Sequence, residues 1–563
     1  MKQTLTRFIF LLAFFPAAPV LFAQAPKGVT ARHGMVVSAH PDASRVGVAI
    51  LRQGGNAVDA AVAVQFALAV TFPVAGNIGG GGFMVYRQAG GATATLDYRE
   101  KAPAAASERM YQDSLGNVIP GLSLNGHLAA GVPGSVDGMV EAHKKYGSLP
   151  WAALVQPAVD LARNGVVLTE KEANGLNHSR ENFVKYNTHV PYLVREQPWQ
   201  RGDTLKHPAL AATLERIRDR GREGFYGGET ADMIVREMKT ANGIITHEDL
   251  QNYHSVWRDA VTGIYKQYRI ISMPPPSSGG VALLQLLRIV EPFDLRAAGW
   301  NTPRTVHLMA EAERRVYADR AAHLGDPDYY RVPVKNLLDP QYLTQRIQSI
   351  DTVRATSSDA IKAGEFARGE SDQTTHFSIV DRHGNAVSIT TTLNGGYGAK
   401  VVVREAGFLL NNEMDDFSVK PGAPNMYGLV GGQANAIAPG KRMLSSMTPS
   451  IVEKNGKLYL VVGTPGGSTI ITSVFQTVLN VLEHGLGMQQ AVSAKRFHHQ
   501  WLPDQITAEE GAFTPATTAA LQAKGHKIVF IPAIGRVDDI LVRKKRRIEG
   551  GADPRGDDTA VGY

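Results

Sequence analysis

The chain has 563 residues, no cysteine and a formal net charge of +7, and 44% of its residues are hydrophobic. This composition is typical of a folded protein with a large core and excludes a disordered chain. At about 100–200 residues per domain, the length alone would allow roughly three to five domains. A chain without cysteine has no disulfides, thiolate metal sites, iron–sulfur clusters or thiol nucleophile. Covalent catalysis would therefore need an oxygen nucleophile, a lysine or a histidine.

The positive charge is concentrated in two short segments. Lys2 and Arg7 contribute two charges near the N-terminus, the run Arg543–Arg547 contributes five, and the charges of the other residues balance. Nucleic-acid-binding proteins usually spread basic charge over a face that also carries aromatic residues, so no nucleic-acid partner is expected. The basic run is interpreted as a solvent-exposed turn or hairpin, with contact to an anionic surface as the alternative.

The first 25 residues have the features of a secretory signal peptide. Lys2 and Arg7 form a positive start, residues 8–22 are apolar, and Ala23 and Ala25 are small residues suited to cleavage. The apolar run is shorter than the roughly 20 residues that span a bilayer, and two prolines interrupt it. An uncleaved N-terminal anchor is the alternative. We expect a periplasmic or secreted protein with no stable membrane anchor.

Apolar spacing predicts three helices along the large N-terminal part. Residues 46–71 resemble one long apolar helix, which the sequence Gly54-Gly55-Asn56 could break or restart. Further helices are expected at 281–290, after a proline-rich connector, and at 305–322. Residues 351–373 are polar and are interpreted as an exposed linker that stops at Thr374.

Four consecutive glycines, Gly79–Gly82, precede a predicted strand at 83–86. A phosphate-binding loop needs a lysine-bearing glycine motif in front of a helix, and this segment has neither feature. The glycines are instead expected to allow close packing of backbone against backbone.

A threonine-rich hairpin is predicted around residue 383. Residues 374–380 and 386–393 alternate like strands, and residues 381–385 form the turn between them. A three-residue loop would place Gly384 in the left-handed conformation. Counting outward from this turn places Thr374 opposite Thr392, whereas a loop one residue longer would break the match.

Thr374 is a candidate nucleophile because it directly follows the polar linker, where cleavage of the chain would make it an N-terminal residue. A threonine hydroxyl is a weak nucleophile, but the α-amine of the same residue activates it when that residue begins a chain. An α-amine titrates near pH 8, so a useful fraction is neutral base at physiological pH. The scheme requires cleavage of the Gln373–Thr374 bond, which the polar linker would tolerate. The alternative is an ordinary threonine-rich strand.

Three later segments add polar groups suited to catalysis or binding. Asn411–Asp416 clusters carboxylates that could hold an ammonium group, and Leu444–Met447 places two hydroxyls between apolar residues. Val461–Ser468 predicts a strand that ends in a Gly-Gly turn before a helix, where backbone N–H groups suit a developing oxyanion. A solvated loop and a simple turn are the alternatives.

Together these motifs closely resemble those of the γ-glutamyltransferases, or glutathione hydrolases, in the N-terminal-nucleophile hydrolase superfamily. The resemblance extends in order from about residue 30 to the C-terminus. Its motifs are 76–83, 97–100, 374–378, 392–394, 409–418, 444–447, 464–468 and 496–500.

The resemblance implies an α+β fold, a four-layer αββα sandwich of two stacked antiparallel sheets. It implies a precursor that cuts itself between Gln373 and Thr374, giving a large subunit, 26–373, and a small subunit, 374–563, which remain one intertwined heterodimer. Thr374 is then the nucleophile of both self-cleavage and turnover, and Thr392 hydrogen-bonds it.

The resemblance also implies which groups bind the substrate. Arg99 pairs with the α-carboxylate, with Ser445 and Ser446 beside it, because a guanidinium suits a carboxylate. The group that holds the α-ammonium consists of Asn394, Glu413 and Asp416. The amides of Gly466 and Gly467 form the oxyanion hole.

The implied reaction is acyl transfer without a cofactor or a metal. Thr374 attacks the γ-amide of glutathione or another γ-glutamyl compound, and the resulting ester is passed to water or to an amino acid or dipeptide acceptor. Relatives carry either Gln or Glu at the position of Glu413, and a carboxylate should not change the reaction class. Residues 421–432, with Tyr427, resemble a lid that shields the acyl-enzyme and favours ordinary γ-glutamyl peptides.

Two alternatives stay open at this point. One is a glutaryl (cephalosporin-type) acylase of the same superfamily, whose substrate lacks the α-amine. The other is an exported amino-acid-binding homologue that never matures.

Overall fold

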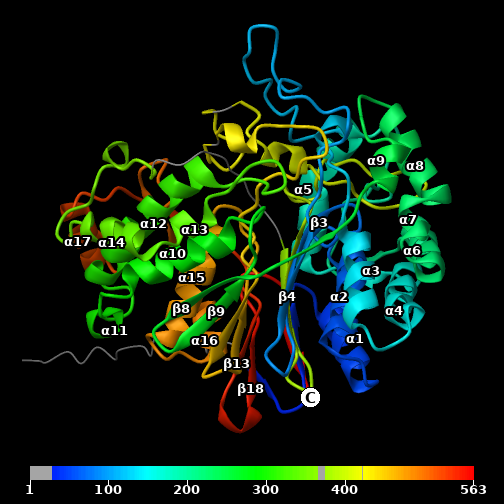
Figure 1. The fold of residues 1–563 in the computed structure, drawn as a ribbon. Coiled ribbons are helices and arrows are strands. Elements are labelled where there is room, and N and C mark those ends of the chain that lie inside the picture. Colours follow the sequence, from blue (N-terminus) through cyan, green and yellow to red (C-terminus); the bar gives the residue numbers. More distant parts are fainter. Residues whose placement is uncertain (1–27, 365–374, 421, 431) are drawn as a thin grey trace, which may run out of the picture.

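The computed structural model describes residues 28–364, 375–420, 422–430 and 432–563. Two seven-stranded sheets lie face to face at the centre, and helices cover the outer face of each (Figure 1). The predicted four-layer αββα sandwich is therefore confirmed. The expected signal peptide and the Gln373–Thr374 bond lie outside the described residues.

Both large sheets are antiparallel and mix strands from distant parts of the sequence. The first sheet has the order β1 (Val29–Ala31), β18 (Ile548–Gly551), β17 (Asp539–Val542), β13 (Lys457–Val462), β12 (Ser450–Lys454), β9 (Tyr268–Ser272), β8 (Val261–Tyr265). The second has the order β19 (Thr559–Gly562), β2 (Met35–Ser38), β10 (Thr375–Val380), β11 (Ala386–Thr392), β3 (Gly81–Arg87), β4 (Thr93–Tyr98), β7 (Val256–Arg258).

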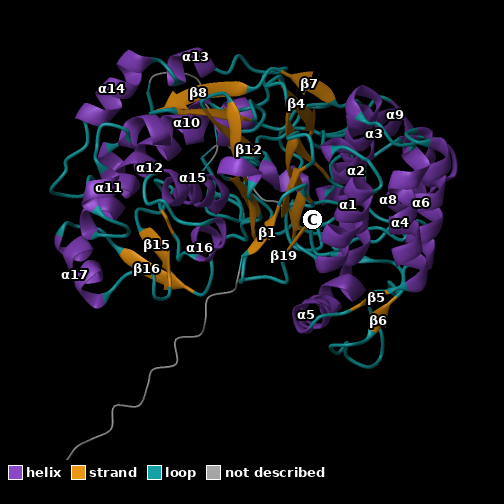
Figure 2. Ribbon diagram, turned by 90° about the horizontal axis from the view of Figure 1, so that it is seen from below, coloured by secondary structure: helices purple, strands orange, loops and turns teal. Residues whose placement is uncertain are grey.

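Each helical layer packs on one sheet, as Figures 1 and 2 show from two directions. Helices on the second sheet's side include α1 (Pro41–Arg52), α2 (Ala57–Thr71), α3 (Ser135–Tyr146), α4 (Trp151–Asn164), α6 (Pro208–Arg220), α7 (Glu223–Tyr226), α8 (Gly228–Lys239) and α9 (His247–Gln251). Those beside the first sheet include α10 (Gly279–Val290), α11 (Leu295–Ala298), α12 (Pro303–His323), α13 (Val334–Leu337), α14 (Pro340–Gln348), α15 (Thr469–Leu482), α16 (Met488–Ser493) and α17 (Pro515–Ala523). Separate from these lie α5 (Glu170–Tyr186), the pair β5 (Val166–Val167) and β6 (Thr204–Leu205), and a small sheet of β14 (Phe497–His498), β15 (Ile506–Glu509) and β16 (Ile528–Ile531).

The predicted helix over 46–71 is two helices in the structure. α1 ends at Arg52, and α2 begins after Asn56, whose side chain accepts hydrogen bonds from the amides of Val58 and Asp59. The Asp59 carboxylate in turn accepts a hydrogen bond from the Asn56 amide, so the interruption is a complete capping box. Every residue of α2 is buried, which explains why its sequence is apolar on all sides.

The interpretation of 351–373 as an exposed linker agrees with most of its described residues, 351–364, but two of them are buried. Ser358 and Ile361 are buried, and Thr356 donates to the Glu311 carboxylate of α12 from both its amide and its hydroxyl. A polar composition hid this packing because the partners of these residues are themselves polar. The remainder, 365–373, lies outside the described residues.

Each large sheet contains strands from both sides of residue 374. In the second sheet, β10 and β11 follow residue 374 and lie between β2 and β3, which precede it. Separating the two parts of the chain would break these strand ladders. The fold therefore has no domain boundary at residue 374, and a proposed cleavage there would leave the halves intertwined.

The basic run lies where the sequence predicted, on the hairpin that joins β17 and β18. Residues 544–547 are exposed. Within the described part of the chain, no helix combines the length and the apolar character that crossing a membrane requires.

Candidate active site

The predicted hairpin register is confirmed over the described residues. Thr375 pairs with Thr391 and Val380 pairs with Ala386, and Gly384 has φ +92° in the turn. The Asp381 carboxylate accepts from three successive turn amides, those of 383, 384 and 385, which fixes the loop at three residues. Thr374 itself lies outside the described residues, so its position opposite Thr392 stays a prediction.

β11 ends in a buried polar cluster. The Thr392 hydroxyl donates to the Glu413 carboxylate at 2.6 Å and accepts from the Asn394 amide at 2.7 Å. Asn394 has φ +68°, a left-handed conformation that asparagine tolerates, and its side-chain amide donates to the Asn412 carbonyl at 2.9 Å. The candidate residues at this strand end therefore contact one another directly.

Arg99 stands at the end of β4, fully buried, and faces three carboxylates. Its guanidinium forms ion pairs with Glu413 at 2.7 Å, with Asp416, and with Glu100 at 3.4 Å. It also donates to the carbonyls of Met443 and Leu444. In this state, the residue predicted to bind a carboxylate is paired with the residues predicted to bind an ammonium.

Burial sets the ionisation of this cluster. Desolvation raises the pKa of Glu413 well above its usual range, although Arg99 opposes the shift. Desolvation likewise raises the pKa of Glu100 to about 8, with Arg99 again opposing. Three buried carboxyl groups surround one guanidinium, and the raised pKa values of Glu413 and Glu100 favour protons on the site in place of a second cation. The site can therefore accept a further positive charge.

The Ser445–Ser446 segment is held by residues of the preceding half of the chain. The Ser445 carbonyl accepts from both the amide and the hydroxyl of Ser278, at 2.6 and 2.7 Å. The Ser446 hydroxyl accepts from the Arg320 guanidinium of α12 at 2.6 Å, and the same guanidinium donates to the Ser278 hydroxyl. The segment directly follows Leu444, whose carbonyl binds Arg99.

The predicted oxyanion loop joins β13 to α15. Gly466 and Gly467 have φ +137° and +66°, and the amides of Thr469 and Ile470 bond back to their carbonyls as the helix begins. Within the described residues, the amides of Gly466 and Gly467 donate to no protein acceptor. Orphan N–H groups at a helix start provide the donors that an oxyanion hole needs.

Close packing brings this loop beside the strand that follows Thr374. A Cβ on Gly463 would lie 2.3 Å from the ring of His376 on β10. His376 is fully buried, and desolvation lowers its pKa to about 3, so its ring is neutral. Its role here is packing between the two sheets.

The lid segment contacts the polar residues that follow the end of β11. The Tyr427 hydroxyl donates to the Asn394 side chain at 3.2 Å, and Gln500 donates to the Tyr427 carbonyl at 3.1 Å. Asn425 organises the turn by accepting from the amides of Tyr427 and Leu429. The predicted lid residue therefore contacts a predicted substrate-binding residue.

The four-glycine run packs as predicted. A Cβ on Gly80 would lie 1.9 Å from the Thr392 carbonyl, and one on Gly79 would lie 2.2 Å from the Leu409 carbonyl. The Asn411 side chain closes this packing by donating to the Gly79 carbonyl at 2.9 Å. Glycine is required here because backbones approach where a side chain would stand.

Gly80→Ala is expected to destabilise the protein by about 3 kcal/mol, because the added methyl group would displace the end of β11. Thermal or denaturant unfolding measures the loss. Gly90→Ala is the matched control, since nothing lies within 4 Å of a Cβ there, and a change within ~0.5 kcal/mol is expected. Equal stability of the two variants would contradict the packing argument.

Asp415 is expected to give the lid region a pH-dependent stability. Desolvation raises its pKa to about 6, and a hydrogen bond from Ser123 opposes this shift. The unfolded value is about 3.9, so between roughly pH 4 and 6 the folded state retains a proton that the unfolded state releases, and stability falls as the pH rises. Relative to Asp415→Asn, the wild type should lose about 2–3 kcal/mol between pH 4 and pH 7.5.

Chemical unfolding of both proteins across this pH range measures the difference. Ser123→Ala removes the opposing hydrogen bond, so it should move the transition to higher pH. A difference between wild type and Asp415→Asn that is flat with pH would contradict the assignment.

Several residues of this site were missed by sequence reasoning. Ser278, Arg320, Asn411 and Gln500 position the predicted groups, and Glu100 pairs with Arg99. Gln500 belongs to the segment 496–500, which the sequence singled out without a role. Asn411 and Glu100 likewise belong to the motifs 409–418 and 97–100, which gave them no role. Ser278 and Arg320 carry no local signal, because their partners lie far away along the chain.

The fold has two stacked antiparallel sheets between helical layers, and its threonine-rich hairpin leads to a buried cluster of opposite charges. These features define a hydrolase of the N-terminal-nucleophile type. Residues 43–563 match the profile of the family described as Gamma-glutamyltranspeptidase. The chain belongs to that family.

Relatives of known name agree with this membership. The chain is 47% identical to the glutathione hydrolase proenzyme of Escherichia coli (strain K12), over 97% of this chain and 95% of the relative. It is 36% identical to the acylase ACY 1 proenzyme of Pseudomonas sp. (strain V22), over 96% and 95%.

Solved structures with the same fold come from both groups. Cephalosporin acylase from Bacillus halodurans superposes with a TM-score of 0.86 at 27% identity, covering 98% of this chain and 99% of that one. A chain of Helicobacter pylori gamma-glutamyltranspeptidase superposes with a TM-score of 0.57 at 44% identity, covering 62% of this chain and 97% of that one.

Proposed function

We propose that this protein is an exported glutathione hydrolase and γ-glutamyl transferase, made as a proenzyme that cleaves itself before Thr374. The observation that carries the proposal is the buried cluster in which Arg99 faces Glu413 and Asp416 beside Thr392. The cluster offers one positive and several negative partners at the end of the hairpin strand. That arrangement is complementary to an amino acid zwitterion, such as the α-carbon end of a γ-glutamyl group.

Substrate binding then exchanges one set of ion pairs for another. The substrate α-carboxylate takes the place of the protein carboxylates on Arg99, and the α-ammonium accepts Glu413, Asp416 and Asn394 as partners. The exchange conserves the number of buried charge contacts, which limits the desolvation cost. The ammonium also supplies the second positive charge that the three carboxyl groups around Arg99 lack.

Catalysis follows from the position of the γ-carbonyl over the nucleophile. The Thr374 hydroxyl adds to the carbonyl carbon while its own α-amine accepts the proton. The amides of Gly466 and Gly467 donate to the oxyanion, and a single such donor is worth about 3–4 kcal/mol in comparable sites. The C–N bond breaks, the leaving amine takes the proton, and a γ-glutamyl ester on Thr374 remains.

The second half of the reaction regenerates the hydroxyl. Water, or the amine of an amino acid or dipeptide acceptor, attacks the ester, and the α-amine of Thr374 again handles the proton. The contact between Tyr427 and Asn394 supports a lid over this intermediate, where the lid would limit the access of water.

A glutaryl acylase is the second candidate, because cephalosporin acylase shares the fold. A glutaryl group has no α-ammonium, so it would add negative charge to a site that already holds three carboxylates around one guanidinium. Electrostatics therefore favours γ-glutamyl over glutaryl substrates.

The deciding experiment combines N-terminal sequencing of the purified protein with anilide assays. We expect two chains, one beginning at Thr374 and the other after the leader, and faster release from γ-glutamyl anilide than from glutaryl anilide. A single uncleaved chain that binds amino acids without turnover would instead support the non-maturing homologue. Faster glutaryl release would support the acylase.

A further inference from the structure

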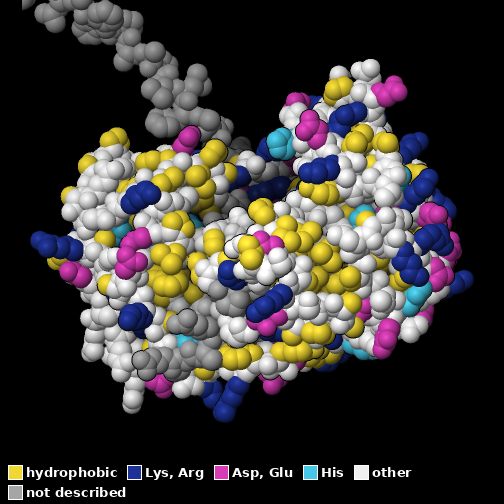
Figure 3. Space-filling view, turned by 90° about the horizontal axis from the view of Figure 1, so that it is seen from above, with side chains coloured by type: hydrophobic (Ala, Val, Ile, Leu, Met, Phe, Trp, Pro, Cys, Tyr) yellow, Lys and Arg dark blue, Asp and Glu magenta, His cyan; other side chains and the backbone are white. Residues whose placement is uncertain are grey.

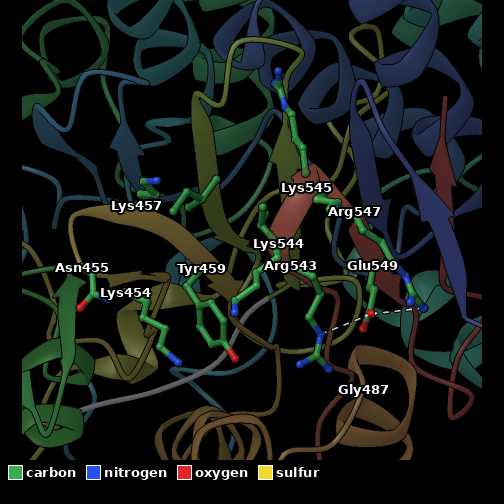
Figure 4. Close-up of a pocket in the computed structure, with 13 residues that line it drawn as sticks. Lys454, Asn455, Lys457, Tyr459, Gly487, Arg543, Lys544, Lys545, Arg547 and Glu549 are labelled. Carbon is green, nitrogen blue, oxygen red and sulfur yellow. Dashed lines mark hydrogen bonds and ion pairs between the residues drawn. The ribbon is translucent and has the colours of Figure 1, made fainter.

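A basic groove lies between two neighbouring hairpins of the first sheet. It has a volume of about 1190 Å³, and seven of its lining residues are Lys or Arg, against one carboxylate, Glu549. Lys454 and Lys457 come from the β12–β13 hairpin, and the run 543–547 comes from the β17–β18 hairpin (Figure 4). Leu458, Tyr459 and Val542 also line the groove and add apolar surface to it.

Most of this charge is not neutralised within the described protein. Glu549 lies 3.3 Å from Arg543 and 3.4 Å from Arg547, as Figure 4 shows. Lys457, Lys544 and Lys545 are exposed and form no ion pair with any described residue. Like charges at this density repel one another, so an anion bound between them would be stabilised.

The groove also holds the charge excess of the folded chain. Outside the leader and the run 543–547, the positive and negative residues balance. Figure 3 shows the end of the molecule seen from above in Figure 1, where basic and acidic side chains are intermixed. The run 543–547 therefore accounts for the net positive charge that remains outside the leader.

Two cationic residues of the β17–β18 turn have a left-handed backbone conformation, which is unfavourable for long side chains. Lys545 and Arg546 have φ +55° and +57°, a region that glycine and asparagine occupy more easily. The neighbouring hairpin uses Asn455 and Gly456 for its left-handed pair, which is the favoured chemistry. Lys545 and Arg546 occupy the equivalent positions of the β17–β18 turn, which indicates that their positive charge has a function.

The groove lies at the other end of the strands from the candidate active site. β13 begins at Lys457 in the groove and ends at Val462, just before the loop that carries Gly466 and Gly467. Six residues at about 3.3 Å each separate the two by roughly 20 Å. A ligand in the groove would leave the active site open.

We propose that this groove docks the protein reversibly on a membrane surface through anionic phospholipid headgroups. The cationic lining residues match the phosphates, and the apolar lining residues match the glycerol and upper acyl region, which a soluble polyphosphate lacks. Docking at this end would direct the catalytic end away from the bilayer. The contact is electrostatic and peripheral, so it adds no stable anchor.

Co-sedimentation with vesicles tests the proposal. The wild type should bind vesicles of phosphatidylcholine mixed with phosphatidylglycerol and not vesicles of phosphatidylcholine alone, and raising the salt from ~0.05 M to ~0.5 M should release it. The combined variant Lys457→Gln, Lys544→Gln, Lys545→Gln should bind about 100-fold more weakly, at about fivefold per lysine. Its γ-glutamyl anilide hydrolysis in solution should be unchanged.

The matched control removes the same charge elsewhere, in the combined variant Lys185→Gln, Lys206→Gln, Lys239→Gln, whose three lysines are exposed. This control should retain vesicle binding to within a few-fold. Equal losses in the two variants, equal binding to neutral vesicles, or binding of soluble polyphosphate without binding of phosphatidylglycerol vesicles would each overturn the proposal.

Discussion

Thr374→Ala is expected to abolish both chain cleavage and turnover. The variant should run as one chain on denaturing electrophoresis, and γ-glutamyl anilide hydrolysis should fall by at least about 10⁴-fold, because losing a nucleophile removes the covalent route. Thr374→Ser keeps a hydroxyl and an α-amine and should retain slower cleavage and turnover.

The control for local structure is Thr375→Ser, at the next position in the sequence and the first residue of β10. Thr375 is buried and pairs with Thr391, so this conservative change should leave two chains and near-normal activity. Two chains in the Thr374→Ala variant would contradict the role given to Thr374. If the Thr374→Ala variant remained one chain but kept normal turnover, Thr374 would be required for self-cleavage and would not be the nucleophile of turnover.

Arg99→Lys is expected to raise KM for γ-glutamyl substrates by about 10–100-fold, with a smaller effect on kcat. Lysine keeps the positive charge that the buried Glu413 and Asp416 require but loses the planar fork that holds a carboxylate in two places. The loss corresponds to about 1.4–3 kcal/mol of binding energy. Steady-state kinetics with γ-glutamyl anilide measures both parameters.

Arg87→Lys is the matched control for this variant. Arg87 is also buried and pairs with Glu453 at 2.7 Å, in an ion pair between the two sheets. Its replacement should lower the melting temperature and leave KM unchanged. If Arg99→Lys changed only stability and not KM, Arg99 would be a structural ion-pair partner and not the carboxylate-binding group.

Local features of the sequence predicted the hairpin and the close packing of the glycine run. The register of β10 and β11 was predictable because a three-residue turn fixes which residues face each other, and strands alternate with a period of two. The close packing of Gly79–Gly82 was predictable because only glycine allows such approaches. The αββα class and the roles of the site residues came from resemblance, since no local pattern encodes how strands from separate segments pair.

Predictions made from composition were less successful. The segment 351–364 is polar but partly buried, because Thr356 and Ser358 satisfy charged groups of distant elements. The long helix over 46–71 is divided because the Asn56 and Asp59 side chains begin a new helix. Apolar spacing alone does not distinguish a kink from a restart.

The sequence by itself determined that any nucleophile must be other than cysteine, that a threonine hairpin leads to Thr392, and that the basic charge is concentrated in 543–547. These are properties of composition and of short-range geometry. Only the tertiary structure decided that Arg99 is buried against Glu413 and Asp416, and that the basic run forms a groove with Lys454 and Lys457. Both assemblies join residues that lie far apart along the chain, and sheet pairing, together with the burial that follows from it, brings them into contact.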